Sequence, residues 1–144
     1  LVRQDPSPEM INALVEEILR ITSPSANMFR RTTREVEVAG VTIPENAMCF
    51  ARFAAANQDD ERFEDALKFD ITRTNLREHV AFGKGVHHCL GAALSRREMN
   101  GGFKVIFQRL ENFRLAPGAG EPEFSANALL HGLTGLQVAF DRIA

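Results

Sequence analysis

The sequence predicts a mainly α protein with small β hairpins, an α+β arrangement, and three observations lead to this prediction. Apolar residues recur at helical spacing over residues 8–22 and again over residues 90–110. Between them, a short valine-rich stretch with alternating apolar positions is interrupted by Gly40, as in a hairpin. The 144 residues are 44% hydrophobic and 25% charged, which is typical of one soluble globular domain with its own core.

The first helix is predicted from both its cap and its apolar stripe. Ser7 is a suitable N-cap, Pro8 takes the first helical position, and Glu9 follows in the first turn. The apolar positions fall at i, i+3, i+4, i+7 and i+8: Ile11, Leu14, Val15, Ile18 and Leu19. We expect this helix to end between Thr22 and Pro24.

A hairpin and a further strand are predicted next. The apolar positions of the hairpin, on either side of a turn at Ala39-Gly40, are Val36, Val38, Val41 and Ile43. Residues 47–53 form a candidate strand, which leads into a short helix at residues 54–57. Residues 58–80 then lose any regular pattern, and so long an irregular segment is unusual in a compact domain unless it has a function.

The second half of the chain begins with a glycine-rich loop, residues 82–89, and continues into a second helix over residues 90–110. The apolar face of that helix is predicted from Leu90, Ala93, Leu94, Phe103, Ile106, Phe107 and Leu110. Gly101-Gly102 lies within it and costs roughly 1 kcal/mol per glycine relative to alanine. After a loop at residues 117–122, residues 128–133 and 136–143 are predicted to pair as a hairpin around Thr134-Gly135.

Charge and composition exclude several classes of function. The 17 basic and 19 acidic residues give a net charge of −2, whereas a nucleic-acid-binding surface needs a basic excess. All 11 aromatic residues are phenylalanine. No apolar run approaches the roughly 20 residues that span a bilayer, so we expect no membrane association. The two cysteines, Cys49 and Cys89, do not form a disulfide framework, and we expect a reduced, cytoplasmic protein.

Cys89 is the strongest candidate for a chemical role, because it lies where the glycine-rich loop becomes a helix. The amides of a helix N-terminus favour an anionic sulfur, which is a good metal ligand. Gly83 and Gly85 allow the loop to fold tightly beneath a flat cofactor, and Gly91 removes a side chain on the helix side. Phe82 is placed to shield the sulfur from water.

Other interpretations of this stretch are weaker. Cys89 alone could be an inert buried cysteine. His87, His88 and Cys89 are adjacent and lack a second Cys/His pair at zinc-ligand spacing. Gly83-Lys84-Gly85 lacks the full pattern of a phosphate-binding loop.

The residues Phe82-Gly-x-Gly-x-His87-x-Cys89-Leu90-Gly91 resemble the haem-binding loop of the cytochromes P-450 at every fixed position. This resemblance implies that Cys89 is the axial thiolate ligand of the iron of haem b, and that His87 contacts a haem propionate. Phe82, Gly83 and Gly91 match further positions that line the haem. In a looser match, Arg30 aligns with the family's propionate-binding arginine, with Arg31 as the alternative in a neighbouring register.

A second motif of the same family is Glu-x-x-Arg, which Glu17 and Arg20 match. The i, i+3 spacing puts the two side chains on one flank of a helix, within reach of a salt bridge. The resemblance implies a third, structural cation from the segment Phe63–Asp70, where Lys68 occupies the position of the usual arginine.

The resemblance implies that residues 1–144 form the carboxy-terminal haem-binding portion of a cytochrome P-450 fold. The amino-terminal portion and the central oxygen-activating helix are not found in this sequence. The complete protein is then expected to be a haem-thiolate monooxygenase that inserts one atom of O2 into a small organic substrate. Electrons would come from a ferredoxin-type partner and its reductase. The alternatives are a peroxide-using enzyme of the same fold and a non-catalytic haem-binding fragment.

The resemblance also places basic residues near the expected proximal side: Lys84, Arg96, Arg97 and Lys104. They would form either a docking patch for an acidic redox protein or an ordinary solvated helix face.

Overall fold

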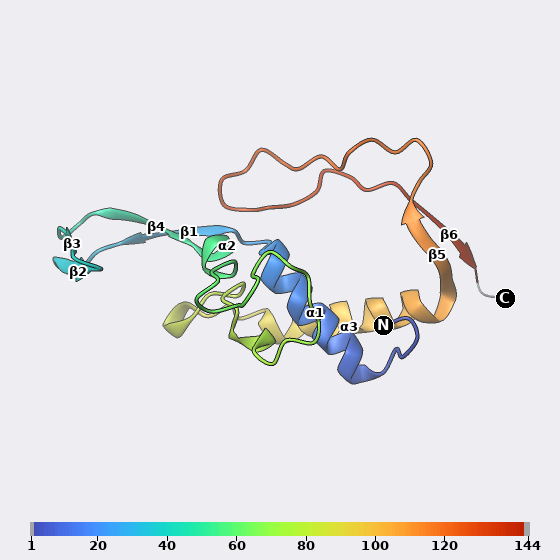
Figure 1. Ribbon diagram of the computed structural model, residues 1–144. Coiled ribbons are helices and arrows are strands. Elements are labelled where there is room, and N and C mark those ends of the chain that lie inside the picture. The colour runs from blue at the N-terminus through green and yellow to red at the C-terminus, as the bar shows by residue number, and fades with distance from the viewer. Residues whose placement is uncertain (1, 143–144) are drawn as a thin grey trace.

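The computed structural model describes residues 2–142, and Figure 1 shows two crossing helices from which β ribbons extend. The helices are α1 (Pro8–Thr22), α2 (Phe53–Ala56) and α3 (Ala92–Arg109), with 3-10 turns at Leu76–Glu78 and Gly85–His87. The strands are β1 (Asn27–Arg31), β2 (Val36–Val38), β3 (Val41–Ile43), β4 (Met48–Arg52), β5 (Leu110–Leu115) and β6 (Val138–Arg142). Within residues 2–142, no helix is both long enough and apolar enough to cross a bilayer.

Helix α1 begins and ends as its sequence predicts. The Ser7 hydroxyl accepts a hydrogen bond from the Met10 amide at 3.3 Å, and Pro8 takes the first helical position. At the other end Ser23 adopts a left-handed conformation, with φ at 40°, and its amide donates to the Leu19 carbonyl. The predicted stripe is confirmed, since Ile11, Val15 and Leu19 are buried.

The core lies between α1, the start of the cysteine loop and α3. Val15 and Leu19 of α1 form a buried cluster with Ala81, and Phe82, Met99 and Phe103 pack around it. Figure 1 shows α1 crossing α3 at this level. Because the residue that follows Ala81 opens the loop to Cys89, the main apolar contact of the molecule also anchors that loop.

The predicted apolar face of the second helix is only partly correct. Leu90 precedes the first turn and is fully exposed, and Ala93 and Leu94 are exposed as well. Ala92 is buried instead, and the half-buried Met99 and Phe103 follow two and three turns later. Since α1 covers only one side of α3, the positions in phase with Ala92 are the ones that pack.

The first β ribbon extends away from the helices (Figure 1). Strand β1, which the sequence analysis did not predict, pairs antiparallel with β4, from Asn27 opposite Arg52 to Arg31 opposite Met48. The predicted hairpin, β2 with β3, forms the tip of the ribbon. Its turn residues Ala39 and Gly40 both have positive φ, at 50° and 78°, as a two-residue hairpin turn requires.

The predicted carboxy-terminal hairpin is wrong. Strand β6 pairs with β5, not with residues 128–133, and the latter make only isolated bridges. Phe113 and Phe140 stack at 6.5 Å between ring centres across this pair, a contact that favours the observed partner. Leu110 accordingly opens a strand instead of closing α3. Ile143, which the predicted hairpin included, lies outside the described residues.

Candidate functional site

The cysteine loop, residues 82–89, folds back on itself through its own backbone. The Cys89 amide donates to the Phe82 carbonyl at 2.9 Å, which closes the loop at its base. Within it, the His88 amide donates to the Gly85 carbonyl at 3.0 Å. Gly83 and Gly85 have φ at 69° and 77°, a region where other L residues are strained. The loop therefore has one compact shape, with its glycines where the backbone requires them.

Cys89 presents an accessible thiol at the end of this loop. It is exposed and unbonded, whereas Cys49 on β4 is half-buried and also unbonded. Helix α3 starts three residues further on, and the Ala92 amide donates to the Cys89 carbonyl at 3.2 Å. The N-terminus of α3, which carries a partial positive charge, therefore lies close to Cys89. A Cβ at Gly91 would lie 3.8 Å from the Cys89 Sγ atom, so glycine keeps the approach to the sulfur open.

A cavity of about 600 Å³ brings most of the predicted haem-binding residues together. Its walls include Arg30, Phe82, Gly83, His87 and Cys89. Arg31 does not line the cavity, and its guanidinium instead donates to the Asn46 carbonyl. Of the two arginines, Arg30 is therefore the one that lies beside Cys89 in this cavity.

The lining of this cavity fits a flat apolar group that carries carboxylates and a metal. Leu19, Met28 and Phe53 supply apolar walls, while one thiol faces the interior. Arg30 and His87 offer cationic or hydrogen-bonding groups for carboxylates. This donor set, a thiol, a guanidinium and an imidazole around one partly apolar space, fits the haem that the sequence resemblance implies.

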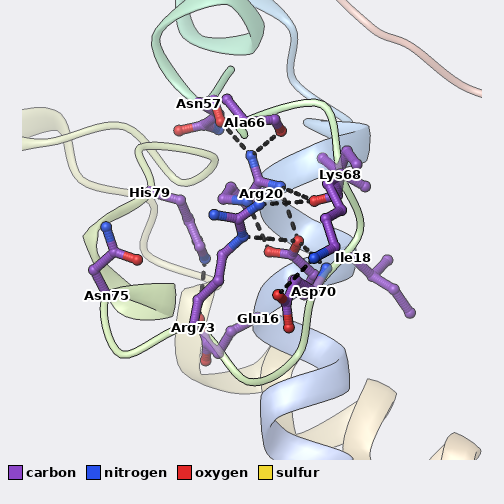
Figure 2. A network of polar contacts seen from close by, with 12 residues as sticks. Glu16, Ile18, Arg20, Asn57, Ala66, Lys68, Asp70, Arg73, Asn75 and His79 are labelled. Atoms are coloured by element: carbon purple, nitrogen blue, oxygen red, sulfur yellow. Dashed lines mark hydrogen bonds and ion pairs between the residues drawn. The ribbon is translucent and has the colours of Figure 1, made fainter. Parts of the chain in front are cut away.

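Arg20 and Glu17 form a fully buried ion pair on α1, and Figure 2 shows Arg20 among its partners from the irregular segment. Both side chains have an exposed fraction of 0%, and Arg20 Nε lies 2.7 Å from Glu17 Oε2. Each of the five N–H groups of Arg20 has an acceptor: the two carboxylate oxygens of Glu17 and the carbonyls of Asn57, Ala66 and Lys68. The guanidinium also lies 5.1 Å from the centre of the Phe63 ring. The pair thus fixes the path of the irregular segment against α1.

The predicted part of Lys68 in this cluster is wrong for its side chain. The Lys68 side chain is 65% exposed and forms an ion pair with Asp70 at 3.7 Å, and only the Lys68 carbonyl reaches Arg20. The third member of the cluster, and its second cation, is Arg73, which is labelled in Figure 2. Its Nε lies 3.4 Å from Glu17 Oε1, and its side chain is 8% exposed. Arg73 also donates to the carbonyls of Glu64, Asp65 and Lys68. A planar guanidinium can make this many contacts, whereas an ammonium cannot.

These contacts decide the charge of Glu17. Burial alone would raise the pKa of its carboxyl group. Hydrogen bonds from Arg20 and from the Asp70 amide, together with the charges of Arg20 and Arg73, outweigh burial and lower the pKa below 4.5. Glu17 is therefore ionised at neutral pH and matched by two cations.

Glu16 forms a second buried network, which the sequence analysis missed. Its carboxylate accepts from Arg96 Nε at 2.7 Å and Nη2 at 3.0 Å, and it contacts His79 Nε2 at 3.0 Å (Figure 2 shows His79 beside it). Burial raises the pKa of Glu16, but the hydrogen bonds from His79 and Arg96 lower it from 4.5 to about 2. The Arg96 guanidinium is thus bound by Glu16, and the Arg96 side chain is only 27% exposed, so Arg96 is not a freely accessible member of the predicted docking patch.

The signal that could have revealed this network is the Glu16-Glu17 pair itself. Two neighbouring acids on one helix cannot share a single flank, so a buried pair requires cations on two sides. The sequence alone does not show that Arg96, eighty residues away, is one of them.

Comparison with known proteins places this fold and site in a family. A family model described as cytochrome P450 matches residues 7–137. The chain therefore belongs to the cytochrome P450 family, and the expected fold, the carboxy-terminal part of the P450 fold, is confirmed.

Individual relatives agree with this assignment. The chain is 41% identical over 138 residues to cytochrome P450 107B1 of Saccharopolyspora erythraea, covering 95% of this chain and 33% of the relative. It is 38% identical to 6-deoxyerythronolide B hydroxylase of the same organism, covering 98% of this chain and 34% of the relative. Among solved structures, substrate-free CYP150A6 of Mycobacterium marinum superposes with a TM-score of 0.91 at 32% identity, over 99% of this chain and 36% of that one. The chain thus spans about a third of the length of these relatives.

Proposed function

We propose that this chain is the carboxy-terminal haem-binding portion of a haem-thiolate monooxygenase, with Cys89 as the axial ligand of haem b. The observation that carries the proposal is the shared cavity: the Cys89 thiol, Arg30 and His87 line one space of about 600 Å³. When bound, a thiolate-ligated haem supplies the activation of O2 that places one oxygen atom in an organic substrate and reduces the other to water.

The residues of this chain would bind and orient the cofactor. Arg30 and His87 would pair with its two propionates, one from β1 and one from the cysteine loop. Gly83 and Gly91 would let the backbone approach closely, and Phe82 would cover the loop side. The cluster of Glu17, Arg20 and Arg73 lies outside the cavity and would act by holding the irregular segment in place.

The remaining components of the reaction belong to the complete protein. We propose a small organic substrate, a cytoplasmic location, and electrons from a ferredoxin-type protein and its reductase. The names of two relatives, 6-deoxyerythronolide B hydroxylase and mycinamicin IV hydroxylase/epoxidase, support oxygenation of an organic molecule as the reaction class.

For the 144 residues alone, a specific observation favours a second candidate, a non-catalytic haem-binding fragment. The chain covers about a third of its relatives. The sequence also contains no acid–alcohol motif of the kind that the family uses to deliver protons to bound oxygen. Haem binding without turnover is the expected behaviour of this part by itself.

The test is an absorption spectrum of the complete protein, loaded with haemin, reduced and treated with carbon monoxide. The strongly red-shifted band of a thiolate-ligated haem should appear in the wild type and be lost in Cys89→Ala. Cys49→Ala is the matched control, because Cys49 does not line the cavity, and it should keep the band. Identical spectra of wild type and Cys89→Ala would refute the ligand assignment.

Oxygenation itself needs a separate measurement. With isotopically labelled O2, a redox partner and substrate, one labelled atom per product molecule should appear. Labelled oxygen in the product only when peroxide is labelled would favour the peroxide-using alternative.

A further inference from the structure

The Glu16–Arg96–Phe82 contact links the first helix to the base of the cysteine loop. Arg96 lies in the second turn of α3 and is bound by both carboxylate oxygens of Glu16. The carbon at the centre of its guanidinium lies 4.6 Å from the centre of the Phe82 ring, within the range of a cation–π contact. One guanidinium thus binds a buried acid with its edge and covers an aromatic ring with its face.

His79 also fixes the position of the Glu16 carboxylate, in addition to Arg96. The Ala81 amide donates to His79 Nδ1 at 3.2 Å, so the ring hydrogen resides on Nε2, which donates to Glu16. His79 and Glu16 are both about 1% exposed in their side chains. Because His79 already binds the Oε2 atom of Glu16, the carboxylate can orient Arg96 without rearranging.

Phe82 transmits this arrangement to the cysteine. Its carbonyl accepts the hydrogen bond from the Cys89 amide, the contact that closes the loop. Its ring packs on the core cluster of Val15, Leu19 and Ala81. Displacing the ring would therefore move the backbone atom to which Cys89 is tied.

We propose that Glu16 and Arg96 are positioning residues that hold the Phe82 ring at the base of the cysteine loop and thereby fix the backbone of Cys89. Phe82 lies seven residues before Cys89 and Arg96 lies seven residues after it, so the loop is held from both of its ends. Charge alone does not perform this role. It needs a planar cation that pairs with two oxygens and stacks at once, which lysine cannot provide.

The first test is hydrogen exchange of the Cys89 amide in the complete protein, with and without added haemin. Arg96→Gln and Glu16→Gln should each accelerate this exchange about fivefold, the change expected when one cation–π contact is lost. Arg96→Lys should accelerate it as much, although it keeps the charge. Arg97→Gln is the matched control, because Arg97 is the exposed neighbour on the same helix, and it should leave the rate unchanged.

A double-mutant cycle identifies the route of the effect. In a Phe82→Leu background, Arg96→Gln should add nothing further to the exchange rate, because the ring that it orients has gone. Additive effects of the two substitutions, an unchanged rate in Arg96→Gln, or full rescue by Arg96→Lys would each overturn the proposal.

The second test, the reduction potential of the haem-loaded protein, rests on the proposed function and separates positioning from direct charge. Removing the positive Arg96 and removing the negative Glu16 would shift the potential in opposite directions if each acted only by its charge. If both act by holding Phe82, Arg96→Gln and Glu16→Gln shift it in the same direction. Opposite shifts would overturn the proposal, whereas a failure of the wild type to bind haem would refute the proposed function and leave the exchange test decisive.

Discussion

Replacing Arg20 by lysine tests whether the buried cluster depends on the number of N–H donors or only on the positive charge. Arg20 uses five N–H groups on five acceptors, and four of these hydrogen bonds are buried while the one to the Lys68 carbonyl is partly buried. Lysine has three N–H groups, so at least two hydrogen bonds are lost and their acceptors stay buried. Hydrogen bonds to a charged group contribute about 1.5–3 kcal/mol each, so Arg20→Lys should lower the free energy of unfolding by about 3–5 kcal/mol.

The assay is urea unfolding of the complete protein at neutral pH, followed by far-UV circular dichroism. Lys68→Gln is the matched control, because the Lys68 side chain is 65% exposed while the substitution leaves its carbonyl, which accepts from Arg20, unchanged. It should cost less than about 1 kcal/mol. If Arg20→Lys costs no more than Lys68→Gln, the argument from donor number is refuted.

Three further predictions concern the second network and the glycines. Because the pKa of Glu16 is lowered from 4.5 to about 2, its ionised form contributes stability that is complete above pH 4.5 and is lost as the pH falls towards 2. Over that interval the wild type should lose roughly 3 kcal/mol more than Glu16→Gln in stepped-pH urea titrations, and equal losses would contradict the assigned pKa. Gly83→Ala, at a φ of 69°, should cost about 1–2 kcal/mol in thermal unfolding, and a neutral effect would show that the loop relaxes. Gly101→Ala should raise stability by about 1 kcal/mol in the same assay, because nothing lies within 4 Å of the added Cβ, and destabilisation would reveal a close neighbour there.

Local features were predictable from the sequence. The cap at Ser7, the stripe of α1 and the turn at Ala39-Gly40 depend on residues within one turn of each other, and the structure confirms all three. The carboxy-terminal strand pairing was not predictable in this way. The Phe113–Phe140 contact joins residues far apart in sequence, whereas the predicted hairpin relied on the nearest turn.

In the candidate site too, local motifs could be predicted from the sequence, whereas contacts between distant residues could not. The motif around Cys89 and the pair Glu17–Arg20 could be identified from their resemblance to a known family, and the cavity brings Arg30 to the same place as Cys89. The second cation of the cluster could not be chosen correctly, because Lys68 and Arg73 both lie on a segment without regular structure. The backbone path of this segment decides which of the two side chains points inward, and that path is set by buried contacts.

The way in which the irregular segment is held has a consequence for the order of folding. Carbonyls at Asn57, Ala66 and Lys68 bond to a side chain of α1, and Arg73 binds further carbonyls beside them. Without a repeating ladder of its own, this stretch has no stable shape to acquire in advance. It should become protected only after α1 has formed and packed, so on refolding its amides would be the late ones.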